Sequence, residues 1–305
     1  MLNIRRILFP TDLSDGAARA FPQAAAFADR HDADLHIVHV AGAKSEADAP
    51  LPVSHDTLQD WLGESSGDSL SLDGLSIVQN QVESDTPPER IVAYIEDENI
   101  DLVVMGTHGR RGVRRILLGS VTEEVVRTAS CPVLTVRTGA EKPSRQSIRR
   151  ILVPVDFSEA SESAVQHATE IAKTYGAELD LLHVVEDVVY PSAYGVELPS
   201  VPATDVVSRV KKALDNMARE QVGHEDVQVS AQIGHAPLTI LDYAETNDVD
   251  LIVLSTHGRA GLDRILLGSV AERVMRQAPT PVFLVRPNQK SLLPSARGQA
   301  TTESE

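Results

Sequence analysis

Two glycine-rich stretches of nearly the same sequence carry the residues best suited to bind a ligand. Residues 106–120 read GTHGRRGVRRILLGS and residues 255–269 read STHGRAGLDRILLGS, so eleven of fifteen positions are identical without a gap. Glycine lets a ligand approach the backbone closely. The first stretch also carries four cationic side chains, Arg110, Arg111, Arg114 and Arg115. Small residues, hydroxyls and cations in one loop are typical of a polyphosphate site.

Each glycine-rich stretch is expected to connect a strand to a helix. An apolar run precedes it, and a helix is predicted to follow the first stretch, with Ser120 as its cap. Ligands of open parallel sheets bind at the carboxyl ends of the strands, and helix N-termini favour anions. We therefore expect the amides of Gly119, Ser120 and Val121 to face a phosphate, with the hydroxyls of Ser120 and Thr122 as further donors.

The same stretches also allow interpretations other than an anion site. Glycines also suit tight turns and arginines a solvated surface, but two copies in the same setting favour a binding site. The spacing matches neither a Walker loop, which needs Gly-Lys-Ser/Thr, nor the dinucleotide fingerprint. His108 and His257 have no acidic partner at a fixed spacing, so we expect loop or phosphate-adjacent roles for them rather than catalysis.

The repetition extends over nearly the whole chain. Residues 9–14 (FPTDLS) correspond to 153–158 (VPVDFS), and residues 35–40 (LHIVHV) correspond to 179–184 (LDLLHV). Continuous apolar strands alternate with helices in both copies, which is typical of a parallel sheet covered on both faces. Strands are expected at 7–9, 35–40, 77–82, 102–105, 133–136, 151–153, 179–184, 227–233, 251–254 and 282–285. The sequence therefore predicts an α/β fold with two tandem domains.

Prolines and polar segments mark the expected boundaries. Pro10 is expected to stop the first strand, and Pro22 falls inside a helix predicted from Ser14 to about Arg30, where a proline costs about 3 kcal/mol. The predicted division of the chain is a first domain over 1–140, a second over 146–287 and a disordered tail over 288–305.

Composition limits the class of protein. The 305 residues suit two domains of about 150 residues each. The formal net charge of −16 repels nucleic-acid phosphates and anionic membranes, so we expect neither as a partner. A single cysteine, Cys131, excludes an intramolecular disulfide and is expected to be a buried core residue. Without a signal peptide or a run of about 20 apolar residues, the protein is expected in the cytoplasm.

The spacing Gly-x2-Gly-x9-Gly-Ser that begins at Gly106 resembles the ATP-binding signature of the universal stress protein family, the UspA-like proteins. Further marks of that family are Pro10-Thr11-Asp12, His39-Val40 and Met105-Gly106-Thr107-His108-Gly109-Arg110. The resemblance implies two tandem Rossmann-like (adenine nucleotide alpha-hydrolase-like) domains, each an open five-stranded parallel sheet with helices on both faces. It also implies a stress-response protein, often dimeric, rather than a defined metabolic enzyme.

The resemblance assigns contacts to an adenine nucleotide, with ATP first, ADP or AMP as alternatives, and Mg²⁺ as a candidate companion. Asp12 would contact the nucleoside and the backbone of Val40 the adenine. The contacts expected in the first copy are Pro10, Thr11, Asp12, Val40, Met105, Gly106, His108, Gly109, Arg110, Gly119, Ser120, Val121 and Thr122. Those expected in the second copy are Pro154, Val155, Asp156, Val184, Leu254, Ser255, Gly258, Arg259, Gly268, Ser269 and Val270.

The second copy departs from the family pattern. Ser255 replaces the first motif glycine, and Ala271 replaces Thr122 with the loss of one donor. If only one copy binds, we expect it to be the first. His39 and His183, by contrast, occur in both copies, and each is expected to bond a backbone partner at its strand end.

Three functions remain open on the sequence. The leading hypothesis is an ATP-binding stress-response module whose nucleotide state tunes oligomerisation or the binding of an unidentified protein partner. The alternatives are an interaction module of the same fold without nucleotide and a slow ATPase, in which Asp12 and Asp156 hold Mg²⁺ through water or phosphate. By resemblance, the two domains are expected to pack edge to edge through residues 133–136 and 282–285, and two chains to associate further.

Overall fold

The computed structural model describes residues 2–42, 53–63, 70–107, 118–137, 147–186, 203–223, 227–256, 267–287 and 289–294. The strands of the first unit are β1 (Arg6–Thr11), β2 (Asp34–Ala41), β3 (Ile77–Glu83), β4 (Leu102–Gly106) and β5 (Val133–Val136). Its helices are α1 (Asp15–Ala18), α2 (Phe21–His31), α3 (His55–Leu62), α4 (Pro87–Asp97) and α5 (Ser120–Thr128), with a 3-10 turn η1 (Leu72–Gly74).

The second unit repeats this order of elements. Its strands are β6 (Arg150–Pro154), β7 (Glu178–Val185), β8 (Val227–Ile233), β9 (Leu251–Ser255) and β10 (Val282–Val285). Its helices are α6 (Glu159–Tyr175), α7 (Ala203–Met217), which continues into the π-helical turn η3 (Ala218–Val222), α8 (Ala236–Thr246) and α9 (Ser269–Gln277). Within the described part of the chain, no helix has both the length and the apolar character that crossing a membrane requires.

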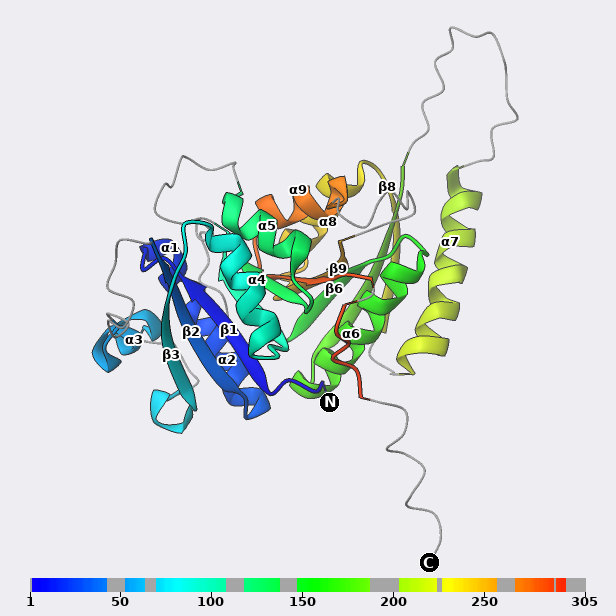
Figure 1. Ribbon diagram of the computed structural model, residues 1–305. Helices are drawn as coiled ribbons and strands as arrows, with labels where there is room; N and C mark the ends of the chain where they lie inside the picture. Colours follow the sequence, from blue (N-terminus) through cyan, green and yellow to red (C-terminus); the bar gives the residue numbers. More distant parts are fainter. Residues whose placement is uncertain are drawn as a thin grey trace, which may run out of the picture.

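The strands of both units form one ten-stranded sheet in the order β3-β2-β1-β4-β5-β10-β9-β6-β7-β8 (Figure 1). Neighbouring strands run parallel within each unit, and the central pair of β5 and β10 is antiparallel. The expected α/β class with two tandem Rossmann-like units is confirmed. The pairing of β5 with β10 also joins the two segments that were expected to meet edge to edge.

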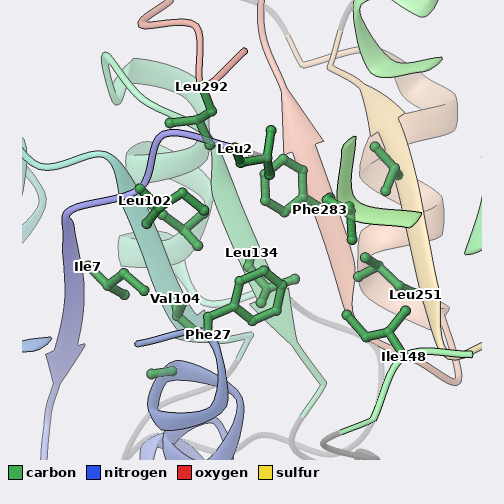
Figure 2. Close-up of a cluster of buried hydrophobic side chains, with 14 of the residues drawn as sticks. Leu2, Ile7, Phe27, Leu102, Val104, Leu134, Ile148, Leu251, Phe283 and Leu292 are labelled. Atoms are coloured by element: carbon green, nitrogen blue, oxygen red, sulfur yellow. The ribbon is translucent and has the colours of Figure 1, made fainter. Parts of the chain in front are cut away.

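Two hydrophobic clusters cover the two faces of this sheet. One lies under α2, α3, α6 and α7, and the other lies under α4, α5, α8 and α9. The first cluster is continuous across the junction of the units, where Leu134 of β5 lies opposite Phe283 of β10 (Figure 2). The two units therefore share one core on this face.

Pro10 and Pro22 occupy other positions in their elements than the sequence predicted. The strand β1 runs through Pro10 to Thr11, and Pro10 lies opposite Val38 of β2. On the other side of β1, the pairing with β4 ends at Leu8, so no β4 residue is paired with Pro10. The single helix expected from Ser14 is wrong, because the chain forms α1 and α2 instead. Pro22 is the second residue of α2, where its missing amide is not needed.

The tail predicted from residue 288 is wrong for residues 289–294, which pack against the first unit. Leu292 is fully buried, and its carbonyl accepts a hydrogen bond from the Asn3 amide at 2.8 Å. The amide of Lys290 donates to the Ser130 carbonyl at 2.8 Å, and its ammonium forms an ion pair with Asp101 at 2.6 Å. Residues 295–305 lie outside the described residues. Cys131 is buried, as expected.

Arginines bridge the two units reciprocally at helix C-termini. Arg137 follows β5 and donates from Nη1 to the Gln277 carbonyl of α9 at 3.0 Å. Arg286 follows β10 and donates to the carbonyls of Arg127 and Thr128 at the end of α5. Cations at helix C-termini are favourable because the last carbonyls lack intrahelical partners. Each unit therefore caps a helix of the other.

His31 is the last residue of α2 and lies beside the contact of that helix with α6. Its ring stacks on Phe27, which also contacts Tyr175 with ring centroids 5.8 Å apart. The Nε2 atom of His31 has no hydrogen-bond partner among the described residues. Burial, with help from the Arg30 cation and the N-terminus, lowers the pKa of His31 to about 4.

We expect the free energy of unfolding to fall as the pH drops from about 6.5 to about 4, because only the unfolded chain then binds a proton at His31. The contribution is about 3 kcal/mol at most. Urea unfolding at a series of pH values measures it, with the His31→Phe variant as the control that keeps the ring stack. The prediction is wrong if both proteins lose stability with the same slope in this window.

Candidate functional site

The candidate site of each unit lies where the strand order reverses. In the first unit β1 lies between β2 and β4. The strands β2 and β3 extend the sheet on one side of β1, and the strands β4 and β5 extend it on the other side. In open α/β sheets, ligands bind outside the carboxyl ends of the strands at such a switch point. Asp12 follows β1, Val40 lies near the end of β2, and Gly106 ends β4. Parallel pairing therefore brings these three predicted contacts to one edge of the sheet.

The turn after β1 is held by its own side chains. The Oδ1 atom of Asp12 accepts hydrogen bonds from the Ser14 amide at 3.1 Å and the Ser14 hydroxyl at 2.6 Å. The Ser14 hydroxyl oxygen in turn accepts from the Ala17 amide and caps α1. The helix cap is therefore Ser14, and Asp12 supports it. Thr11 is buried, and its Oγ1 accepts from the Leu13 amide at 3.0 Å, so only its backbone can face a ligand.

The same turn recurs in the second unit and contains a feature that the sequence interpretation missed. The Oδ1 atom of Asp156 accepts from the amide and hydroxyl of Ser158. Leu13 and Phe157 each follow the aspartate with φ values of 62° and 61°, a left-handed conformation that is unfavourable for bulky residues. The repeated Asp-x-Ser spacing signals the turn, but no sequence signal marks a leucine or phenylalanine as left-handed.

Both strand-end histidines bond the turn, as expected. The Nδ1–H of His39 donates to the Thr11 carbonyl at 2.8 Å. The Nδ1–H of His183 donates to the Val155 carbonyl at 2.6 Å, and its ring lies 4.9 Å from that of Phe157. Each histidine therefore ties the end of the second strand of its unit to the turn that carries the aspartate.

The base of the glycine-rich loop is closed by a backbone hydrogen bond in each unit. The Gly119 amide donates to the Thr107 carbonyl at 2.8 Å, and the Gly268 amide donates to the Thr256 carbonyl at the same distance. The expectation that the Gly119 amide faces a ligand is therefore wrong. A Cβ atom on Gly268 would lie 3.1 Å from the Thr256 oxygen, so this glycine permits the close approach.

The first turn of α5 also differs from the prediction. Gly119 is the N-cap, and Ser120 is the first helical residue rather than the cap. The hydroxyl of Thr122 is not a donor for phosphate, because it donates to the Gly106 carbonyl at 2.9 Å in a buried position. Ser120 is exposed, and the first amides of a helix have no intrahelical acceptor. Among the predicted backbone donors of this turn, the amides of Ser120 and Val121 therefore have no intrahelical acceptor and remain predictions for the anion site.

The second unit has the same arrangement with fewer polar groups. Ser255 ends β9, Gly268 is the N-cap of α9, and Ser269 is exposed as the first helical residue. Ala271 is buried where the first unit has Thr122, so the second unit lacks the donor that reaches Gly106. Leu254 and Met105 are both buried, and Val184 and Val40 are partly buried.

Several predicted contacts belong to the middle of the two loops. These residues lie outside the described part of the chain: His108, Gly109, Arg110, Arg111, Arg114, Arg115, His257, Gly258 and Arg259. Their predicted roles remain predictions. Among the described residues, no group of three or more His, Cys, Asp or Glu side chains is arranged to hold a metal ion.

Perturbed pKa values mark a buried polar pair in each unit. His36 of β2 lies 2.9 Å from the Tyr94 hydroxyl of α4, and burial lowers the pKa of His36. In the second unit the Tyr243 hydroxyl donates to Asp180 at 3.2 Å. Burial raises the pKa of Asp180 and raises that of Tyr243 to about 12. These pairs join a strand to a helix, and the Oδ1 atom of Asp180 has no hydrogen-bond partner among the described residues.

Comparisons with known proteins agree with the repeat. The family described as "Universal stress protein family" matches residues 3–137 and 147–286. The chain is 29% identical over 301 residues to a universal stress protein of Mycolicibacterium smegmatis, covering 92% of this chain and 97% of that one. It is 30% identical over 265 residues to a universal stress protein of Mycobacterium tuberculosis strain H37Rv, covering 83% and 87%.

Solved structures share the two-unit fold. A universal stress protein from Archaeoglobus fulgidus DSM 4304 aligns with a TM-score of 0.62 at 22% identity, covering 92% of this chain and 98% of that chain. A functionally unknown protein from Pseudomonas aeruginosa PAO1 aligns with a TM-score of 0.66 at 22% identity, covering 93% of both. At this identity the likeness concerns the fold alone.

Proposed function

The chain belongs to the universal stress protein family, and we propose that it binds an adenine nucleotide at the switch point of its first unit. The observation that carries the proposal is the junction of β4 and α5. The end of the strand is tied to the start of the helix, and an exposed Ser120 and the amides of the first turn lie beside the edge that carries Asp12. Helix N-termini in this setting favour phosphate groups.

The residues fit a nucleotide in three respects. Phosphates would meet the Ser120 and Val121 amides, and arginines of the loop would add charge. Asp12, held by Ser14, presents a carboxylate at the same edge for the sugar or base. The preference for adenine, with ATP before ADP or AMP, rests on the family pattern at Val40. Nucleotide state would then tune partner binding or association of two chains in the cytoplasm.

Replacing Ser120 with Asp tests the site with little risk to the fold. An acidic residue in the first turn of a helix is stabilising by about 0.3–1 kcal/mol, because it faces the positive end of the dipole. The same charge repels a phosphate, so we expect Ser120→Asp to lose the nucleotide of the first unit. Ser269→Asp is the matched variant for the second unit, and Ser120→Ala removes the hydroxyl without adding charge.

The measurement is the amount and kind of nucleotide that each purified protein releases on denaturation, followed by calorimetric titration with ATP, ADP and AMP, with and without Mg²⁺. We expect Ser120→Asp to remove one bound nucleotide per chain and Ser120→Ala to retain most of the affinity. Unchanged binding in the Ser120→Asp, Ser269→Asp double variant would place the ligand elsewhere. A wild-type protein that neither releases nor binds nucleotide would favour the interaction module.

A further inference from the structure

We propose that the strand β8 is a self-association surface. It would pair antiparallel with β8 of a second copy of the chain, about a two-fold axis at Ser230. This names the surface through which two chains associate, and it does not depend on nucleotide binding. The pairing repeats between chains the antiparallel contact of β5 with β10 that joins the two units.

The strand β8 ends the ten-stranded sheet and is paired on one side. Figure 1 shows it at one end of the sheet beside α7, and among the described strands its neighbour is β7. The amide and carbonyl of every second residue in an edge strand point away from the sheet and can pair with another strand. None of the seven side chains of β8 is fully buried, and Ile233 is 41% exposed.

The sequence of β8 has none of the features that usually protect an edge strand. Charged side chains, prolines and bulges commonly prevent an edge from pairing with another chain. The sequence VQVSAQI contains neither a charge nor a proline, and it pairs with β7 in unbroken register from Val227 to Ile233. The strand is therefore a suitable template for a further strand.

The side chains of β8 are arranged symmetrically about Ser230. In an antiparallel pair centred there, the opposed residues are Val227 with Ile233, Gln228 with Gln232, Val229 with Ala231, and Ser230 with its own copy. Val227 and Val229 pack on the core under α7, so the apolar pairs lie on that face of the sheet and the polar pairs on the other. Each residue thus meets one of its own kind, and such cross-strand pairs stabilise a sheet.

The symmetry of this pair leads to a closed dimer. A two-fold axis through two antiparallel strands stands perpendicular to the sheet, so it keeps the helices of both copies on their own faces. The contact of β5 with β10 has the same geometry, since the equivalent helices α2 and α6 cover one face. Because both copies use the same surface, assembly stops at two chains.

The opposite edge strand β3 lacks this symmetry. Pairing of β3 with itself about Asn80 would place Glu83 opposite Ile77. Pairing of β3 with β8 of another copy would place Glu83 opposite Val227, and it would produce an open filament because the two surfaces differ. A carboxylate opposite an apolar side chain loses hydration without gaining a partner. The pairing of β8 with β8 is therefore favoured.

Ser230→Cys tests the contact and its register together. In the proposed pair the two introduced thiols lie on opposed residues, whose Cα atoms are about 4.5–5.5 Å apart and within reach of a disulfide. Two copies of Gln228→Cys would lie about 14 Å apart along the strands, too far for the bond. Cys131 is buried and common to both proteins. After oxidation with oxidised glutathione, a non-reducing gel should show a covalent dimer for Ser230→Cys and none for Gln228→Cys.

Sedimentation over a range of protein concentrations gives the Kd of the dimer. We expect the wild type to shift from one chain to two, and Ser230→Lys to raise the Kd about tenfold or more because like charges then face each other. Ser230→Thr should keep the dimer. Gln79→Lys changes an exposed residue of β3 and should leave the Kd unchanged. An unchanged midpoint of urea unfolding would show that Ser230→Lys keeps the fold, because Ser230 is partly exposed.

Three results would overturn the proposal. One is a wild type that stays a single chain at every concentration while Ser230→Cys forms no covalent dimer. Another is a dimer that Ser230→Lys leaves intact, since the chains would then meet at another surface. The third is a covalent dimer of Gln228→Cys without one of Ser230→Cys, or a mass that grows beyond two chains, because neither agrees with a two-fold axis at Ser230.

Discussion

Replacing Phe283 with alanine is expected to lower the free energy of unfolding by about 3–5 kcal/mol, the usual cost of truncating a buried aromatic residue. Phe283 is fully buried in β10, opposite Leu134 of β5, where the cores of the two units merge (Figure 2). The cavity would open inside a sheet that runs through both units. The junction has little freedom to collapse around it, because the strands on both sides are hydrogen-bonded to further strands.

Urea unfolding followed by circular dichroism measures this loss. Val78→Ala is a suitable control, because Val78 lies on the edge strand β3 and is 36% exposed. We expect that control to stay within about 0.5 kcal/mol of the wild type. If Phe283→Ala were as stable as the control, the two units would not share a core. A split into two separate unfolding transitions would show that this core couples the units.

Asp101→Ala is expected to cost about 3 kcal/mol, because it leaves buried donors and a cation without their partner. Asp101 is 6% exposed, and its Oδ2 accepts from the amides of Arg5 and Arg6 at 2.7 and 3.0 Å. Its Oδ1 pairs with the Lys290 ammonium, which also donates to the Asn99 carbonyl at 3.0 Å. One carboxylate thus holds the start of β1 and residues 289–294 together.

Lys290→Ala separates the two parts of this effect. It removes only the ion pair at a partly exposed position, so we expect a loss of about 1 kcal/mol or less. The double variant then gives the coupling between Asp101 and Lys290. If Lys290→Ala cost as much as Asp101→Ala, the amide contacts of Asp101 would contribute little. If neither variant changed the midpoint of unfolding, the anchoring of residues 289–294 would be wrong.

The edge of the sheet that carries the candidate site could be predicted because it depends on short patterns. Apolar strands that alternate with helices lead to parallel pairing, and parallel pairing brings the residues after β1 and β4 to one edge. The histidine bonds followed in the same way, since His39 and His183 end equivalent strands. These inferences needed only the order of elements and the direction of the strands.

The direction of individual polar groups could not be predicted in this way. The Gly119 amide and the Thr122 hydroxyl have the right chemistry for a phosphate, yet both bond the end of β4. A donor takes whichever acceptor the fold brings within about 3 Å, and the sequence does not state that distance. Pro22 likewise was predicted in the interior of a helix, whereas in the structure a separate helix, α2, begins with Pro22 as its second residue.

Repeated local pattern was therefore sufficient for the two α/β units, the order of their elements and the edge at which a ligand would lie. Contacts between residues far apart in the chain were decided only on folding. They include the packing of Leu292 against the first unit and the bond from Thr122 to Gly106. The meeting of β5 with β10 was expected only through the family resemblance, and no local pattern predicts it. Hydrophobic periodicity is a property of neighbouring residues, whereas these contacts depend on how segments far apart in the chain pack together.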